Sequence, residues 1–211
     1  MENKCHAIVI FGTRPEAVKM APVIRELKRR PDEIKTTICI TAQHREMLDQ
    51  VLDAFDISPD IDLDLMRPNQ SLAELTARIF KNLDPVLKKV KPDWLLIQGD
   101  TTTVMSAALL GYYNQIKIGH VEAGLRTHDK WQPFPEEINR RIAGVVTDLH
   151  FAPTENNRQN LLREGIPPEI IKVTGNPVID ALKIIKEQPA PKEAKQLLER
   201  AGVVSGDRQL I

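Results

Sequence analysis

The amino-acid sequence predicts an α/β protein built on a doubly wound parallel sheet. Short apolar runs alternate with longer segments of helical period, and the alternation continues almost to the end of the 211 residues. Several runs are apolar throughout, as expected for strands that are covered on both faces. Alternation of this kind is typical of parallel sheets with right-handed crossover connections.

The predicted strands are short. In chain order they are residues 7–11 (AIVIF), 36–41 (TTICIT), 93–98 (DWLLIQ), 116–121 (IKIGHV), 149–152 (LHFA) and 170–174 (IIKVT). The segment DIDLDL at 60–65 alternates acidic and apolar residues, but it has neither the glycine turn nor the terminal Glu of a calcium loop. It is interpreted as a short edge strand with a charged face.

Helical patterns lie between these strands. Residues 71–90 place apolar side chains at helical spacing, and residues 101–113 are apolar nearly all round, so that helix is expected to be buried. Pro22 lies inside the first helical pattern, where it either kinks the helix or marks the start of a second helix near Met20. Near the end, KEQPAPKEA (186–194) is typical of a linker, and GDRQLI (206–211) resembles the approach to another strand.

Composition excludes several classes of function. Lys and Arg (29) balance Asp and Glu (29), and the aromatic share is only 4%, which argues against nucleic acid and anionic membranes as partners. The apolar run before Gly12 is too short for a secretory signal, and no window approaches a membrane span. Cys5 and Cys39 lie beside apolar runs, and neither cysteines nor histidines have metal-ligand spacing. We therefore expect a cytoplasmic protein with reduced thiols and no bound metal.

Polar residues gather where the predicted strands end. The strand ending at residue 98 leads to Asp100, and the strand ending at residue 121 leads to Glu122 and then Arg126. Because ligands bind at the carboxyl edge of open parallel sheets, charged groups there predict a polar, phosphate-bearing substrate. Asp100 also has a simpler interpretation as the cap of the helix that starts at Thr101. Glu122 has no helix to cap, which favours a functional role.

Other candidates leave alternatives open. Glu136 and Glu137 begin the helix EEINRRIAG, where acids in the first turn interact favourably with the helix dipole. His120, at the end of its strand, either orients a carboxylate or packs in the core. His150 lies inside an apolar strand and is interpreted as structural.

The first loop, FGTRPEAVK, has only one glycine, Gly12. Thr13 and Glu16 match the T-x-x-E capping box, so they serve helix initiation. That interpretation leaves Arg14 and Lys19 unexplained. Because a helix N-terminus already favours anions, two cations beside it indicate a diphosphate site.

A set of ordered motifs extends these local interpretations. They are FGTRPEAVKMAP, TAQHREMLDQVL, QGDTTT, HVEAGLRT, PFPEEINRR, LHFAPTENNRQNL and VTGNPVIDAL. Together they closely resemble the non-hydrolysing UDP-N-acetylglucosamine 2-epimerases of bacteria, over essentially the whole chain. The resemblance implies a GT-B-type fold of two Rossmann-like halves that flank a cleft, of which this sequence forms the N-terminal half.

The resemblance also implies a reaction. It is the interconversion of UDP-N-acetylglucosamine (UDP-GlcNAc) and UDP-N-acetylmannosamine (UDP-ManNAc) by inversion at C2, through elimination and re-addition of UDP. The chemistry needs an acid, a base and cations at the departing diphosphate. Matched by motif, Asp100, Glu122 and Glu136 are the catalytic candidates, with base and acid unassigned, and Arg14 and Lys19 face the diphosphate. No cofactor is implied.

Further binding properties follow from the same resemblance. Arg126 is an additional substrate-binding candidate. The family is activated by its own substrate, and Gln43 and Gln70 match that second site, with Glu136 as a further contact. A homodimer is implied as well.

The expected domain limits are residues 1–175 for a Rossmann-like domain and 176–211 for a crossover helix, a linker and the start of a second domain. The family's histidine-bearing motif and most of its uridine-binding residues would follow Ile211, so we expect this chain alone to be inactive or nearly so. Two alternatives stay open. One is a hydrolysing epimerase that releases ManNAc and UDP, and the other is a non-catalytic nucleotide-sugar-binding domain.

Overall fold

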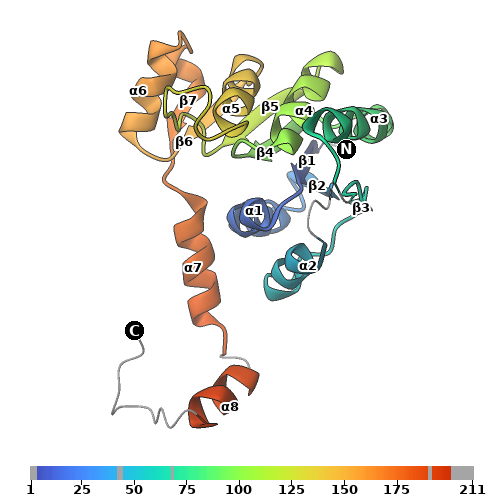
Figure 1. Cartoon of the computed structure of the whole chain (residues 1–211), viewed down its shortest axis with the longest axis vertical. Helices are drawn as coiled ribbons and strands as arrows, with labels where there is room; N and C mark the ends of the chain where they lie inside the picture. Colours follow the sequence, from blue (N-terminus) through green and yellow to red (C-terminus); the bar gives the residue numbers. More distant parts are fainter. Residues whose placement is uncertain (1–3, 42–44, 68, 190–191, 201–211) are drawn as a thin grey trace.

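Seven parallel strands form a single sheet (Figure 1). The structure is a computed structural model that describes residues 4–41, 45–67, 69–189 and 192–200. The strand order is β3–β2–β1–β4–β5–β6–β7, so the direction in which strands are added reverses between β1 and β4. The strands are β1 (Cys5–Phe11), β2 (Ile34–Ile40), β3 (Ile61–Asp62), β4 (Trp94–Gln98), β5 (Lys117–Val121), β6 (Leu149–Ala152) and β7 (Ile171–Val173). Such a reversal opens a crevice at the carboxyl edge of the sheet.

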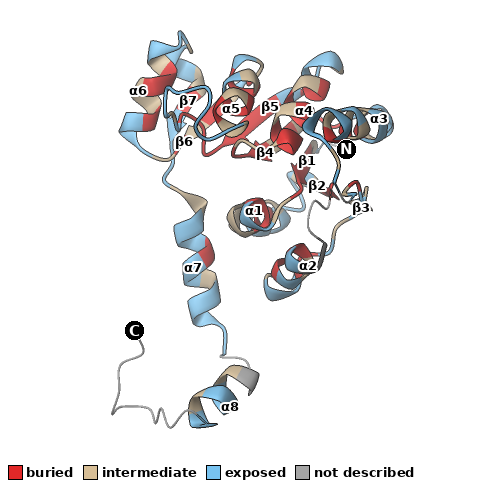
Figure 2. Cartoon of the chain, in the orientation of Figure 1, coloured by how far each residue is buried: buried red, intermediate tan, exposed pale blue. Residues whose placement is uncertain are grey.

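Helices cover both faces of this sheet. In β1, Ile8 and Ile10 pack toward α3, α4 and α5, whereas Val9 and Phe11 pack toward α1 and α2. This two-sided burial explains why the strand is apolar from Ala7 to Phe11 (Figure 2). The helices are α1 (Arg14–Lys28), α2 (Arg45–Ala54), α3 (Leu72–Val90), α4 (Thr102–Tyr113), α5 (Glu136–Val145), α6 (Glu155–Arg163), α7 (Pro177–Glu187) and α8 (Lys192–Arg200), with a 3-10 turn at Pro168–Ile170.

The predicted strands are all present, within one or two residues of their expected limits. The edge strand predicted in DIDLDL is confirmed as β3, although only Ile61 and Asp62 pair. The helix predicted at 101–113 is buried along most of its length, but Tyr112 and Tyr113 at its end are exposed. The segment 206–211, predicted to approach a further strand, lies outside the described residues.

The helix that follows β1 begins where the capping box predicts. The Thr13 side chain accepts from the Glu16 amide, and the Glu16 carboxylate accepts from the Thr13 amide. α1 continues through Pro22 as one helix, so a second helix starting near Met20 is wrong. The burial of Met20 and Ile24 on the sheet outweighs the loss of one helical hydrogen bond at the proline.

α7 leaves the sheet after β7 and packs against α1 (Figure 1). Ala181 is 1% exposed in this contact, but most of the helix faces solvent (Figure 2). At its end, Gln188 Nε2 donates to Ala54 O at 2.9 Å. The domain boundary at residue 175 stays a prediction. None of the helices in the described ranges is both long and apolar enough to cross a bilayer.

Candidate active site

Glu122 lies directly after β5 in a left-handed backbone conformation, with φ of 61°. A residue with a side chain loses about 1 kcal/mol in that conformation relative to glycine. The surrounding structure must therefore hold it, and such strain is common at functional sites. Glu122 is only 5% exposed, so its carboxylate also needs partners.

Donors from separate parts of the chain surround this carboxylate. Oε1 accepts from Lys19 Nζ on α1 at 2.6 Å and from Asn176 Nδ2 at 3.1 Å. Oε2 accepts from Gln98 Nε2, at the end of β4, at 2.6 Å. Both oxygens are thus occupied. Sequence reasoning had assigned Lys19 to a diphosphate, and the structure places it on Glu122.

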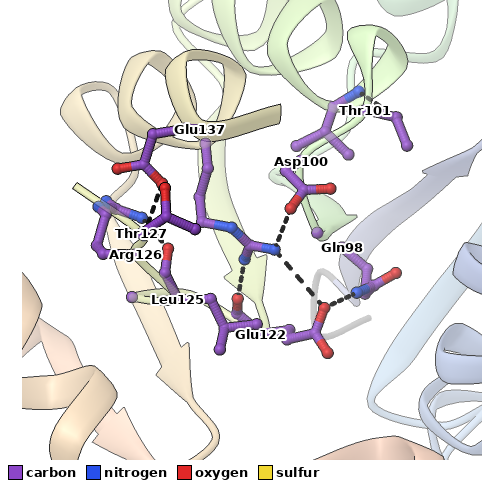
Figure 3. A network of polar contacts seen from close by, with 12 residues as sticks. Gln98, Asp100, Thr101, Glu122, Leu125, Arg126, Thr127 and Glu137 are labelled. Carbon is purple, nitrogen blue, oxygen red and sulfur yellow. Dashed lines mark hydrogen bonds and ion pairs between the residues drawn. The ribbon is translucent and has the colours of Figure 1, made fainter. Parts of the chain in front are cut away.

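Arg140 on α5 joins Glu122 to Asp100. Its side chain is 4% exposed, and its NH2 group lies 2.6 Å from Asp100 Oδ2 and 3.8 Å from Glu122 Oε2. Its NH1 group donates to the backbone oxygen of Glu122. In Figure 3, Asp100, Glu122 and Gln98 point toward one another around these contacts. One buried guanidinium thus partly neutralises two carboxylates.

Arg140 was missed because, within the motif that contains it, only the two acids at the helix start were considered as candidates. Its position carried a signal. In α5, Arg140 shares the buried face of Ala143 and Gly144, at the i, i+3 and i+4 spacing of a helix. A charged residue on such a face needs a buried partner, and the strand-end carboxylates were the candidates.

Asp100 does not cap α4. The N-cap is Thr101, whose hydroxyl accepts from the Val104 amide at 3.3 Å, so the capping interpretation of Asp100 is wrong. The Asp100 side chain is 29% exposed, and only Oδ2 is bound within the described residues. Its second oxygen is therefore available to a substrate.

Glu16 ties the first loop to the loop after β4. Its carboxylate accepts from the amides of Gly12 and Thr13 at 3.0 and 2.7 Å and from the Thr101 hydroxyl at 2.8 Å. Burial raises the pKa of Glu16, although these hydrogen bonds oppose the increase. Arg14, in the first turn of α1, is exposed and has no side-chain partner in the described ranges. It is therefore the available cation at this helix start.

The two acids at the start of α5 differ in their surroundings. Glu137 is 5% exposed and accepts from the amides of Thr127 and His128 at 3.1 and 3.3 Å, so it holds the preceding loop in place (Figure 3). Glu136 is half-buried and makes no hydrogen bond or ion pair with the described part of the chain. Of the pair, Glu136 has the free carboxylate.

Other predicted site residues do not join the Glu122 cluster. The side chain of Arg126 is 1% exposed and contacts both oxygens of Glu164, at 2.5 and 2.7 Å. Burial acts to raise the pKa of Glu164, but its bonds to Arg126 and the charge of that residue hold it below its usual value. Gln70 Nε2 contacts Met66 Sδ at 2.9 Å, before α3. Gln43 lies outside the described residues.

Two buried histidines lie behind the cluster, on neighbouring strands. His120 Nε2 donates to Gly99 O at 2.7 Å and so braces the turn that carries Asp100. Burial lowers the pKa of His120 well below its usual value and lowers that of His150 to about 4, so both are neutral at pH 7. No cluster of three or more metal-ligating side chains occurs in the described ranges.

The fold and this cluster define a class of protein. It is a doubly wound α/β protein with acidic and basic side chains at the carboxyl edge of its sheet, beside the point where the strand order reverses. The sequence model of the UDP-N-acetylglucosamine 2-epimerase family matches residues 25–208. The chain therefore belongs to the UDP-N-acetylglucosamine 2-epimerase family.

Its relatives are similar over almost all of this chain. A UDP-N-acetylglucosamine 2-epimerase of Yersinia pestis is 52% identical over 206 residues, which are 97% of this chain and 54% of the relative. One from Bacillus subtilis is 54% identical over 180 residues, which are 85% of this chain and 47% of the relative. The chain thus spans about half the length of the curated relatives it matches.

Solved structures show the same correspondence. The UDP-GlcNAc 2-epimerase of Neisseria meningitidis, bound to UDP-GlcNAc, superimposes with a TM-score of 0.87 at 52% identity, covering 93% of this chain and 53% of that one. The Methanocaldococcus jannaschii enzyme, in complex with UDP-GlcNAc and UDP, gives 0.83 at 35% identity, covering 92% and 53%. The predicted fold class, a Rossmann-like sheet forming one half of a GT-B-type fold, is confirmed.

Proposed function

We propose that this chain supplies the acid–base and diphosphate side of a nucleotide-sugar site that interconverts UDP-GlcNAc and UDP-ManNAc. The family membership supports the reaction, and the relatives solved with UDP-GlcNAc or UDP support the ligand. The observation that carries the proposal is the cluster itself. Asp100 and Glu122 share Arg140, and Lys19 lies against Glu122 at the carboxyl edge of the sheet.

Inversion at C2 requires a proton to leave one face of the sugar and return on the other, while UDP departs and re-adds. A carboxylate that exchanges protons needs an accessible oxygen. Asp100 and Glu136 have one, whereas both oxygens of Glu122 are bonded. We therefore assign proton exchange to Asp100 and Glu136, and assign Glu122 the role of a fixed anion that orients Lys19.

The departing diphosphate needs positive charge. Arg14 is exposed at the N-terminus of α1, where the helix dipole also favours anions. Lys19 lies about one and a half turns further along the same helix, and its side chain is 24% exposed. An incoming diphosphate thus meets Arg14 first, and Lys19 connects the phosphate side of the site to the carboxylates.

Isothermal titration with UDP tests this binding role. Replacing Arg14 with serine should weaken UDP binding roughly tenfold or more, because a charge-assisted hydrogen bond is lost. Arg30→Ser is the matched control. Arg30 lies just beyond the far end of α1 and pairs with Glu26 at 3.0 Å, so its loss should leave the affinity unchanged. Equal affinities for all three chains, or no binding of UDP at millimolar concentration, would contradict the proposal.

Turnover is followed separately by proton NMR of UDP-GlcNAc in heavy water. Deuterium at C2 together with UDP-ManNAc signals indicates epimerisation, and free ManNAc indicates the hydrolysing reaction. We expect binding with little turnover, because the chain supplies one side of the site.

The remaining family properties are proposed on the resemblance alone. They are a cytoplasmic homodimer and activation by UDP-GlcNAc at a second site that includes Gln43, Gln70 and Glu136. Sedimentation of the chain with and without UDP-GlcNAc tests the dimer.

A further inference from the structure

α7 packs against α1, and hydrogen bonds join its two ends to the rest of the described chain. Ala181 is buried against α1, and Gln188 Nε2 donates to Ala54 O. At the other end, Asn176, immediately before the helix, donates to Glu122 and so reaches the Glu122 cluster. The start of α7 and the candidate active site therefore share a residue.

Both polar atoms of the Asn176 side chain make hydrogen bonds. Oδ1 accepts from the Val178 amide at 3.1 Å and so caps α7. Nδ2 donates to Glu122 Oε1 at 3.1 Å, on the same oxygen that Lys19 contacts. A cap alone needs only an acceptor oxygen, which Ser or Asp supplies equally well. The donor half of Asn176 is the part that capping does not explain.

The backbone before Asn176 offers little other restraint. The last sheet bond in this segment runs from Thr174 N to Ala152 O at 3.0 Å. Gly175 then adopts φ of 82°, and a Cβ placed there would meet no atom within 4 Å. Val173 is 48% exposed. This turn is open on its outer side, and within the described residues the Asn176 side chain makes the hydrogen bond that joins the start of α7 to Glu122.

We propose that Asn176 is a positioning residue that couples the placement of α7 to the Glu122 carboxylate. If α7 moves away, Glu122 Oε1 loses its amide donor and keeps only Lys19, so the carboxylate is stabilised by one hydrogen bond fewer. The coupling is a property of the folded chain. Its consequence for proton exchange and diphosphate binding rests on the proposed function.

A short series of variants distinguishes the capping role of Asn176 from its coupling role. Asn176→Ser and Asn176→Asp keep an acceptor for the cap but remove the Nδ2 amide that donates to Glu122, and Asp adds a negative charge facing Glu122. Asn176→Ala loses both. Ser71→Ala, at the N-cap of α3, is the control because it removes a cap whose hydrogen bonds reach no further than Glu74.

The measurements are made on the nitrogen-15-labelled chain without ligand. The side-chain amide signals of Gln98, which donates to the other oxygen of Glu122 at 2.6 Å, report on the carboxylate. We expect them to shift in Asn176→Ser and further in Asn176→Asp, with hydrogen exchange in α7 about tenfold faster, since a hydrogen bond to a charged group is lost. Ser71→Ala should change neither.

If Asn176 were only a cap, Asn176→Ser would match the unmodified chain in both measurements and only Asn176→Ala would differ. That result overturns the coupling. A titration with UDP separates this outcome from a failure of the proposed function. If the chain does not bind UDP but the Gln98 signals still shift in the variants, the coupling is supported and the proposed ligand is wrong.

Discussion

Replacing Arg140 with methionine removes the cation that joins Asp100 to Glu122. Methionine retains much of the volume, so the loss is mainly electrostatic. Breaking a buried ion pair on one side costs about 3–5 kcal/mol, because a charge is left without its partner. Here Arg140 and Glu122 are 4% and 5% exposed in their side chains, but Asp100 is 29% exposed and Lys19 stays on Glu122 at 2.6 Å. The lower end of that range, about 3 kcal/mol, is therefore expected.

Urea unfolding followed by circular dichroism measures this loss. The midpoint should fall at unchanged slope, and the melting temperature should fall by about 6–12 °C for a chain of this size. Arg30→Met is the control. Its guanidinium is 54% exposed and pairs with an equally exposed Glu26, so the change should stay within about 0.5 kcal/mol.

A double-mutant cycle identifies the source of the loss. In the Arg140→Met background, replacing Asp100 with asparagine removes the charge left behind and should recover about 1 kcal/mol or more. The reasoning is refuted if Arg140→Met costs less than about 1 kcal/mol, or if the second substitution only adds to the damage.

Two further predictions concern stability. Gly124→Ala should lower the free energy of unfolding by at least about 2 kcal/mol, and Gly165→Ala by about 1 kcal/mol. Both glycines have φ above 80°, but only at Gly124 would an added Cβ lie 2.3 Å from a backbone atom, Asn157 O. Equal losses in chemical unfolding would contradict this reasoning. The pKa of His150 is lowered from 6.5 to about 4, chiefly by burial, so the unfolded chain binds a proton there that the folded chain does not. Protonation of the unfolded chain therefore lowers the free energy of unfolding by about 3 kcal/mol as the pH falls from 6.5 to 4, whereas above pH 6.5 this loss is absent. Unfolding measured across that window should be less pH-dependent in His150→Leu, and an unchanged pH profile would contradict the assignment.

The sheet was predictable from sequence because its burial is uniform. Strands such as β1 are covered on both faces, so every residue from Ala7 to Phe11 is apolar and the pattern needs no tertiary information. The helix through Pro22 could not be predicted from local sequence alone. The penalty of the proline is a local property, but the buried contacts of Met20 and Ile24 that outweigh it belong to the assembled sheet. The same holds for the short pairing in β3, which depends on where β2 ends.

The candidate site was predictable to the extent that strand ends define it. Asp100 and Glu122 follow adjacent parallel strands, so their proximity follows from the strand order alone. The contact between Lys19 and Glu122 spans 103 residues, and the sequence had placed Lys19 at a diphosphate instead, because strand order does not set how far a helix side chain reaches. What the strand-end argument omits is any side chain that reaches the edge from a helix. Arg140 is the main example.

Arg126 was predicted at the site and Arg140 was not, and the path of the chain between them explains why. Arg126 follows Glu122 by four residues, so sequence alone places it beside the cluster. Gly124, however, turns the chain with φ of 85°, and its oxygen accepts from the side chains of Asn157 and Asn160 on α6 at 3.3 and 2.9 Å. The turn carries Arg126 toward α6 and Glu164.

The chain then returns through α5, whose buried face presents Arg140 to the two carboxylates. The direction of that turn is set by asparagines about 35 residues further along the chain, through bonds to a single glycine oxygen. The local sequence around Arg126 therefore does not determine the direction of the turn. Loss of both asparagine donors should therefore disturb the arginine placement before it disturbs the sheet, because the strands keep their own apolar contacts on each face.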